Sequence, residues 1–274
     1  MLKIIRNLTI TVILWIYYIF GFFLVYSPFY LYAFFFSERR EEVISPDPSL
    51  EKRENWKDWE KRGREEAFQN LNHRLHESFF SFLRMIVPKV KWRIAEEVKG
   101  LRSSIIIANH LSFLDPILFV SLFEKQKTIV KSNYFKIPVF GWILKTSGYI
   151  PSLTESLFTE PMMKQIKYMK DFLAAGGNLF IFPEGTRSRD GRIGPLDRGA
   201  FRIAKLCNAP IAVIRIRDTH KVFPPGKFLF NTWDTNIIEV ELAGTLVPSY
   251  ESEAFSLSAL MAEAGVLMER KEGP

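Results

Sequence analysis

The feature that most constrains this chain is a long uncharged segment close to its N-terminus. No charged residue occurs between Arg6 and Glu38, and aliphatic and aromatic side chains dominate the segment. A helix needs roughly 20 apolar residues to cross the hydrocarbon core of a bilayer, and this segment is longer. A cleavable signal peptide has a shorter apolar part and a small-residue cleavage site, which the bulky residues 30–36 do not resemble. The sequence therefore predicts a membrane anchor over residues 1–37, with a buried helix of a soluble protein as the less favoured alternative.

Pro28 is expected to interrupt the anchor, because proline lacks a backbone donor and clashes with the preceding helical turn. One bent spanning helix and a re-entrant helical pair are both compatible with this interruption. Basic residues stand on both sides of the segment, Lys3 and Arg6 before it and Arg39 and Arg40 after it. The positive-inside rule therefore does not fix its orientation.

Residues 38–87 are predicted to form a charged and amphipathic helical linker. Residues 38–66 contain eight basic and ten acidic side chains, with Pro46 and Pro48 as helix breakers. From Trp56 onwards, apolar residues recur mostly at steps of three or four, which is the period of an amphipathic helix. Such a helix could pack on the following domain or lie on lipid.

The remaining residues, 88–274, alternate between short β-branched runs and helical stretches, which is typical of an α/β domain. Strands are predicted around residues 90–94, 105–108, 128–131, 178–182, 211–216 and 237–242. Helices are predicted over residues 115–124, 139–147, 160–175, 197–207 and 253–270.

The cysteine count excludes two classes of small, cross-linked fold. Cys207 is the only cysteine, so the chain has neither an internal disulfide nor a cysteine-based zinc cluster. The core must therefore be held by packing, and we predict no metal site.

The first candidate site directly follows the predicted strand 105–108. It contains Asn109, His110 and Asp115, with Pro116 next in the chain. Five positions on a straight helix separate two side chains by about 140°, so His110 and Asp115 can meet only if the chain turns between them. Asp is a favoured N-cap and Pro a favoured first helical residue, which predicts such a turn before a helix. The carboxylate could then fix one ring nitrogen, leaving the other to accept a proton from a hydroxyl. The alternative is that Asp115 only caps its helix.

The second candidate site follows the predicted strand 178–182 and has the sequence Phe-Pro-Glu-Gly-Thr-Arg-Ser over residues 182–188. Gly185 allows a backbone to approach a ligand closely, and the planar guanidinium of Arg187 matches two phosphate oxygens. Thr186 and Ser188 add hydroxyl groups. Taken alone, the segment could equally be a surface turn.

Local charge also favours an anionic ligand. Residues 125–205 contain 14 Lys and Arg against six Asp and Glu, whereas the whole chain has a net charge of +7. Such a field concentrates phosphate-bearing ligands and anionic lipid. Nucleic acid is the less favoured partner, because charge is its only recognition feature here and the apolar anchor indicates a bilayer.

Together these segments resemble the glycerolipid acyltransferases of the lysophosphatidic acid acyltransferase type. Asn109, His110 and Asp115 are similar to the family's NHxxxxD motif, and residues 182–188 are similar to its FPEGTRS motif without a mismatch. Further similarity, in order and spacing, lies in Lys131, residues 135–138, Gly141, residues 148–150 and residues 209–213. The resemblance covers about residues 100–216.

The resemblance implies a mixed sheet flanked by helices, and an enzyme that transfers a fatty acyl group from acyl-CoA or acyl carrier protein to the sn-2 hydroxyl of 1-acyl-sn-glycerol 3-phosphate, giving phosphatidic acid. The acyl thioester is a co-substrate, and no cofactor is expected. His110 would be the general base and Asp115 its orienting partner. The residues expected to bind substrate are Asn109, Lys131, Glu184, Gly185, Thr186, Arg187 and Ser188. The protein is expected at a membrane, with its catalytic domain at the cytoplasmic face.

One departure from the family pattern keeps other acceptors open. The family's second block usually closes with an arginine, whereas residues 151–155 read Pro-Ser-Leu-Thr-Glu. Lys131 or Lys136 could replace that arginine, or the acceptor could be glycerol 3-phosphate or another lysophospholipid. A non-catalytic membrane lipid-binding protein is a further alternative, which intact His110 and Asp115 disfavour.

Overall fold

The computed structural model describes residues 1–36, 56–152, 160–188 and 191–269. Residue 37 of the predicted anchor, and residues 38–55 of the predicted linker, lie outside this description. The helices are α1 (Leu2–Phe20), the π-helix η1 (Gly21–Tyr26), α2 (Ser27–Phe36), α3 (Trp56–Ile86), α4 (Glu96–Lys99), α5 (Leu114–Leu122), the 3₁₀ helix η3 (Ser132–Lys136), α6 (Phe140–Thr146), α7 (Glu160–Ala174), α8 (Arg198–Cys207), α9 (Thr219–Val222) and α10 (Leu257–Glu269). The strands are β1 (Val90–Ile94), β2 (Ile105–Ala108), β3 (Gln126–Val130), β4 (Ile150–Pro151), β5 (Asn178–Ile181), β6 (Ile211–Arg217) and β7 (Asn236–Leu246).

The seven strands form one mixed sheet in the order β1-β7-β6-β2-β5-β3-β4. Five strands, β6, β2, β5, β3 and β4, run parallel to one another. β7 is antiparallel to its neighbour β6, with a register shift between Val213 and Ile214, and the edge strand β1 is parallel to β7. The predicted α/β class and mixed sheet are therefore confirmed. The short strand β4 and the short helices α4, η3 and α9 were not predicted, since two to five residues are too few to show a period.

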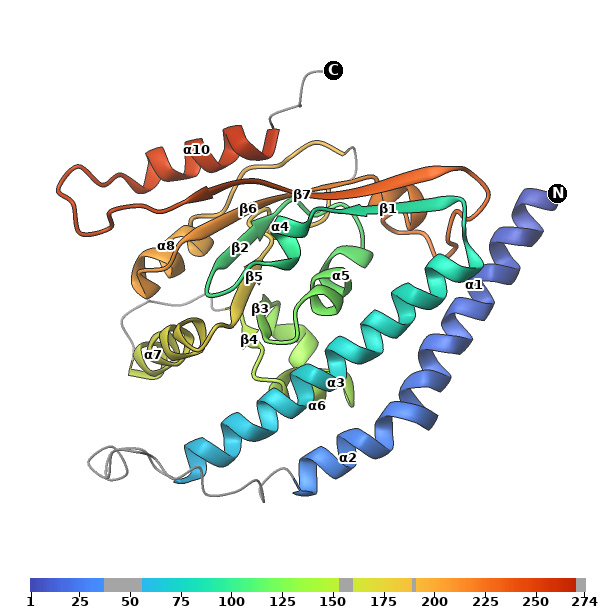
Figure 1. Ribbon diagram of the computed structural model, residues 1–274, viewed down its shortest axis with the longest axis horizontal. Coiled ribbons are helices and arrows are strands. Elements are labelled where there is room, and N and C mark those ends of the chain that lie inside the picture. The colour runs from blue at the N-terminus through green and yellow to red at the C-terminus, as the bar shows by residue number, and fades with distance from the viewer. Residues whose placement is uncertain (37–55, 153–159, 189–190, 270–274) are drawn as a thin grey trace.

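Alternating side chains of the central strands divide the hydrophobic core into two layers, one on each face of the sheet. Ile106 and Ala108 of β2 point to the layer formed with α1, α3 and α5. Ile105 and Ile107 point to the layer formed with α7, α8 and α10. Figure 1 shows these two groups of helices on opposite sides of the strands. Both faces of β2 and β5 are covered, which explains why their sequences are continuously apolar.

The apolar N-terminal segment is one helical rod, Leu2–Phe36, long and apolar enough to cross a membrane. Pro28 stands at the start of α2, and the π-helical turn η1 immediately precedes it. A π-turn absorbs the missing proline donor without ending the helix. The predicted interruption is therefore a change in helical winding, and α1, η1 and α2 follow one another along α3 in Figure 1.

One side of this rod is packed on the rest of the chain along its whole length. Near its start, Lys3 pairs with Asp234 at 2.8 Å. At its middle, the Tyr17 ring stacks on Phe82 with centroids 4.2 Å apart. Further contacts join Asn7 to Thr232, Thr11 to Phe230, Trp15 to Phe223, Tyr30 to Phe68 and Phe34 to Trp142. The opposite side is exposed and apolar.

A buried polar cluster lies where the rod meets α3 and α6. The Nδ1 of His76 lies 2.6 Å from the Asn72 carbonyl oxygen, and its Nε2 lies 3.1 Å from the Tyr18 hydroxyl. Since a carbonyl only accepts, Nδ1 carries the proton and Nε2 accepts from Tyr18. The Asn72 amide continues the cluster by donating to Ser147 Oγ and accepting from Tyr30. Burial lowers the pKa of His76 to about 4.

Candidate active site

The two predicted clusters lie at the same edge of the sheet. The loop with His110 follows β2, the loop with Glu184 follows β5, and these strands pair in parallel in register from Ile105 with Leu179. Lys131 follows β3, the next parallel strand beyond β5. Two inter-strand spacings separate β3 from β2, which is about 10 Å. The carboxyl edge of the sheet therefore gathers all three segments, where open α/β sheets bind their ligands.

His110 and Asp115 are in direct contact. His110 Nδ1 lies 2.9 Å from Asp115 Oδ2. The same oxygen accepts hydrogen bonds from the backbone N–H groups of Leu111, at 2.6 Å, and Ser112, at 2.7 Å. The Asp115 side chain is fully buried, and 16% of the His110 side chain is exposed. The chain turn that the five-residue spacing demands is thus formed around this one carboxylate oxygen.

The position of Asp115 differs from the predicted N-cap. Helix α5 begins at Leu114, so Phe113 is its N-cap and Asp115 is its second residue. From there the carboxylate reaches back over the preceding loop and accepts its N–H groups instead of capping from outside the helix. The buried Asp115 Oδ1 has no hydrogen-bond partner among the described residues. The polar contacts of this carboxyl group are therefore concentrated on Oδ2.

These contacts define which nitrogen of His110 is available. An ionised carboxylate only accepts, so Nδ1 carries a proton and Nε2 is the basic nitrogen. No hydrogen bond within the described part of the chain engages Nε2. The imidazole ring stacks on Phe182, with centroids 4.3 Å apart and an interplanar angle of 24°. The ring is therefore held by a carboxylate at one edge and an aromatic face beneath, with its basic nitrogen unoccupied.

Glu184 binds backbone groups with both of its carboxylate oxygens. Oε1 accepts from the His110 N–H at 2.8 Å, and Oε2 accepts from the Gly194 N–H at 2.8 Å. In return, the Ser188 N–H donates to the His110 carbonyl oxygen at 2.8 Å. Both oxygens of Glu184 are thus engaged by backbone N–H groups, and its substrate contact stays a prediction. Nothing local in the sequence identifies Gly194 as its partner.

Asn109 is likewise committed to the scaffold. Its side-chain amide donates to the Ile216 carbonyl oxygen at 2.9 Å and its oxygen accepts from the Ile216 N–H at 2.7 Å. The side chain is buried and joins the end of β2 to β6. The structure thus places Asn109 next to the base but turned toward β6, so its predicted substrate contact has no support in this geometry.

The other predicted binding residues face outward. Gly185, Thr186, Arg187 and Lys131 are exposed, and Ser188 is half-buried. Gly185 has φ of 64°, a left-handed conformation that an L side chain rarely adopts. Neither Arg187 nor Lys131 forms an ion pair within the described residues. These two cations are therefore available to an external anion at the edge that carries His110.

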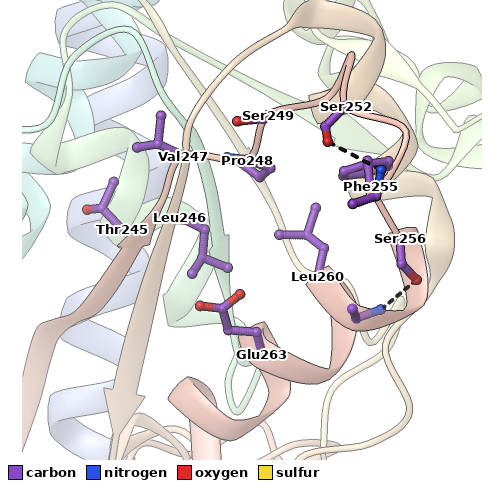
Figure 2. A pocket seen from close by; sticks show the side chains of 12 residues that line it. Thr245, Leu246, Val247, Pro248, Ser249, Ser252, Phe255, Ser256, Leu260 and Glu263 are labelled. Atoms are coloured by element: carbon purple, nitrogen blue, oxygen red, sulfur yellow. Dashed lines mark hydrogen bonds between the residues drawn. The ribbon is translucent and has the colours of Figure 1, made fainter.

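An apolar hollow adjoins the loop of His110. It is lined by Phe113 of that loop, by Leu114 and Ile117 of α5, by side chains of α1 and α3, and by Phe223 and Phe230. A second hollow lies between the end of β7 and α10, where Ser249, Ser252 and Glu263 contribute polar groups (Figure 2). It contains none of the predicted site residues.

The residues of both clusters lie in a stretch that matches a known protein family. The family model described as Acyltransferase matches residues 89–217, a range that contains every predicted site residue. We call this stretch, slightly less than half of the chain, the acyltransferase domain after the family that it resembles. This acyltransferase domain spans β1 to β6 and includes both sheet-edge clusters.

Relatives of the acyltransferase domain carry one recurring name. The chain is 36% identical over 133 residues to a chloroplastic 1-acyl-sn-glycerol-3-phosphate acyltransferase of Brassica napus, covering 48% of this chain and 38% of that protein. It is 34% identical over 145 residues to a chloroplastic protein of the same name in Arabidopsis thaliana, covering 52% of this chain and 40% of that protein. The chain thus spans about two fifths of the length of these relatives.

The fold extends beyond the acyltransferase domain. The crystal structure of PlsC from Thermotoga maritima, titled a 1-acyl-sn-glycerophosphate acyltransferase, superposes with a TM-score of 0.64. The superposition covers 98% of this chain and 96% of PlsC at 19% sequence identity. The N-terminal rod and α3 are therefore part of a fold that PlsC shares.

Proposed function

We propose that this protein transfers a fatty acyl group from acyl-CoA or acyl carrier protein to the sn-2 hydroxyl of 1-acyl-sn-glycerol 3-phosphate, which yields phosphatidic acid. The observation that carries the proposal is the contact of His110 Nδ1 with Asp115 Oδ2, which leaves Nε2 unoccupied at the sheet edge that also carries two exposed cations. The family match and the names of the relatives support the same reaction.

In this reaction His110 Nε2 takes the proton from the acceptor hydroxyl as its oxygen attacks the thioester carbonyl. The Asp115 carboxylate stabilises the imidazolium that forms, because it accepts from Nδ1–H. The tetrahedral intermediate then expels the thiolate, which takes the proton back from Nε2. The products are the ester and a free thiol, so atoms and protons balance without a covalent enzyme intermediate.

The two exposed cations supply the acceptor site of this proposal. Arg187 offers a planar fork for two phosphate oxygens, and Lys131 adds a second positive charge across the edge. Gly185, Thr186 and Ser188 lie in the same turn and can offer backbone and hydroxyl groups. Holding the phosphate there positions the hydroxyl at His110 and makes the encounter intramolecular.

The rod Leu2–Phe36 supports a membrane location for this chemistry. Its outer side exposes aliphatic and aromatic side chains, while its inner side is docked on the domain from Lys3 to Phe34. A helix docked over its full length cannot leave the domain to thread across a bilayer. We propose that it lies within one leaflet, with the domain on the cytoplasmic side where acyl thioesters are made.

In the decisive experiment, the purified full chain is incubated with a panel of acceptors and a donor whose acyl group is radiolabelled. The donor is either acyl-CoA or acyl-loaded acyl carrier protein. We expect label in phosphatidic acid when 1-acylglycerol 3-phosphate is the acceptor, and none with His110→Ala. Preference for glycerol 3-phosphate or a neutral-headgroup lysolipid would redirect the acceptor assignment. Binding of lysolipid without any transfer would favour a lipid-binding protein, and full turnover by His110→Ala would reject the base.

A further inference from the structure

A second patch of exposed apolar side chains lies outside the N-terminal rod. Beyond Phe36, the described chain has nine exposed large hydrophobic residues, and four of them fall within residues 134–140. These four are Tyr134, Ile137, Val139 and Phe140, each between 43% and 50% exposed. We call residues 134–140 the apolar turn. Its exposed side chains stand together, whereas an isolated exposed hydrophobic residue would need no explanation.

The backbone of the apolar turn adopts a conformation of high energy at Val139. Val139 has φ of 62° and ψ of −58°, and the Phe140 N–H donates to the Pro138 carbonyl oxygen at 2.6 Å. This is a γ-turn of the rare, strained hand, and a β-branched residue is especially unfavourable there. The chain then packs so closely that a Cβ on Gly141 would lie 2.3 Å from the Phe135 carbonyl oxygen. The turn is therefore sharply defined and presents Val139 at its tip.

The charge around the apolar turn has one sign. Residues 125–152 contain five lysines and no acidic residue. Lys125 and Lys127 pair with Glu66 and Glu65 of α3. The other three, which are exposed and have no ion pair among the described residues, are Lys131, Lys136 and Lys145. An apolar tip surrounded by free lysines complements the acyl and phosphate layers of an anionic leaflet.

The apolar turn also adjoins the N-terminal rod. Trp142, two residues after Phe140, packs on Phe34 of α2 with ring centroids 5.5 Å apart and on Phe68 of α3 at 5.3 Å. The neighbouring residues of α2, Phe35 and Phe36, are 62% and 48% exposed. The exposed apolar side of the rod and the apolar turn thus lie on either side of this aromatic contact.

We infer that the apolar turn is a second membrane-contacting element, which inserts into an anionic leaflet beside the rod. Lys131 lies between the end of β3 and the apolar turn, so insertion of the turn holds this sheet edge and its cations at headgroup level. A lysophospholipid could then offer its phosphate to Arg187 and Lys131 while its acyl chain stays in the bilayer. This inference rests on the membrane location proposed above.

The test uses the single native cysteine as an advantage. In a Cys207→Ala background, Ile137→Cys carries an environment-sensitive fluorophore, with Ile16→Cys on the rod and Val247→Cys on the far side of the domain as matched sites. The full chain is reconstituted in phosphatidylcholine vesicles with phosphatidylglycerol and nitroxide-labelled lipid. We expect lipid quenching at positions 16 and 137 and aqueous iodide quenching at 247. If iodide alone quenches the probe at position 137 while lipid quenches the probe at position 16, the apolar turn does not insert and the inference is overturned. If iodide quenches the probe at position 16, the proposed membrane location of the rod is overturned instead.

A kinetic test uses Val139→Gly, which removes the apolar tip and suits the positive φ, so the variant should fold at least as well. We expect its KM for vesicle-embedded acceptor to rise about tenfold, the order expected for losing one buried aliphatic side chain. Its KM for acceptor dispersed as detergent-solubilised monomer should not change. Equal KM values for wild type and variant on vesicles would overturn the inference.

Discussion

Two histidines of this chain are held in opposite ways, and the difference shows what a proton-transferring site requires. His110 has a carboxylate at Nδ1 and no partner at Nε2 within the described chain. His76 has a neutral carbonyl at Nδ1 and a tyrosine hydroxyl at Nε2. The first ring can gain a proton at Nε2 with a counter-charge beside it. The second has both nitrogens engaged by neutral groups, and burial lowers its pKa to about 4, so it stays uncharged and structural.

The surroundings of the two rings reinforce this contrast. His110 lies at the carboxyl edge of the sheet, where its backbone N–H and carbonyl are also bonded, to Glu184 and Ser188. His76 lies on α3 and contacts Tyr18 of the N-terminal rod. Position in the fold and the charge of the partner, rather than residue type, therefore separate the histidine proposed as the base from the one that packs in the interior.

The largest expected effect comes from making the partner of His110 neutral. Asp115→Asn keeps the size of the side chain but removes the charge that stabilises the imidazolium, so kcat should fall by about 10³-fold, within the range for a general base and its support. Steady-state kinetics with saturating acceptor measures this fall. Asp171→Asn on α7 is the matched control and should retain activity, because its one ion pair among the described residues, with Arg62, is at 4.0 Å. Activity of Asp115→Asn within threefold of wild type would contradict the assigned contact.

The next largest effect is expected on acceptor binding at the solvent-exposed edge of the His110 site. The buried His76 cluster has no such exposed edge. Arg187→Ala should raise the acceptor KM about 10- to 100-fold, because a charge-assisted contact to phosphate is worth roughly 1.5 to 3 kcal/mol. Arg187→Lys should have an acceptor KM between those of wild type and Arg187→Ala, since lysine keeps the positive charge but lacks the planar guanidinium. Arg202→Ala, an exposed arginine of α8, should leave KM unchanged. If acceptor dependence does not respond to position 187, the phosphate is bound elsewhere.

A smaller effect is expected from loosening the backbone of His110 without touching its ring. Glu184→Gln replaces one accepting oxygen by an NH₂ group, so either the His110 or the Gly194 N–H loses its acceptor. We expect kcat to fall about tenfold and the free energy of unfolding to fall by about 1–3 kcal/mol, the cost of one unsatisfied buried donor. Thermal unfolding and kcat are measured together, with Glu263→Gln on α10 as control. A pure rise in acceptor KM would instead indicate direct substrate contact by Glu184.

The smallest effect on turnover should come from His76, whose influence is on stability. The unfolded chain protonates this histidine near its ordinary pKa of 6.5, whereas the folded chain resists protonation until about pH 4. The unfolded state therefore binds more protons in this window, and the free energy of unfolding should fall as pH falls from about 6.5 to about 4. Denaturant unfolding in detergent micelles across this range should show a shallower slope for His76→Gln. Identical slopes would show that His76 is not the titrating group.

Local sequence was sufficient for the longer helices and strands and for the turn that lets His110 meet Asp115. Helical periodicity predicted α3 from Trp56, and apolar runs predicted β2, β5 and β6. The spacing of five required a turn that the structure forms, because proline after Asp115 and backbone donors before it leave few other arrangements. The predicted domain boundaries at residues 37 and 87 remain predictions, although Phe79 and Phe80 of α3 share a core layer with β2.

Contacts between distant segments could not be predicted in the same way. Glu184 binds Gly194 across ten residues and His110 across 74, and Asn109 binds Ile216 across 107. The role of each side chain is thus set by the sheet order, which brings β2 between β5 and β6. His76 illustrates the same limit, since its partner Tyr18 lies 58 residues away. Tyr18 belongs to the apolar N-terminal segment, whose composition predicts contact with lipid and gives no sign of a contact with α3.

The docking of the N-terminal rod has a practical consequence for anyone who handles this protein. Leu14 belongs to the same buried layer as Phe223 and Phe230, and Trp15 packs against both rings. A fragment that begins after Phe36 would expose this buried layer to water. Removing the rod would therefore create a new aggregation-prone apolar surface instead of making the protein more soluble. Detergent or nanodisc extraction of the intact chain is therefore the route to well-behaved material.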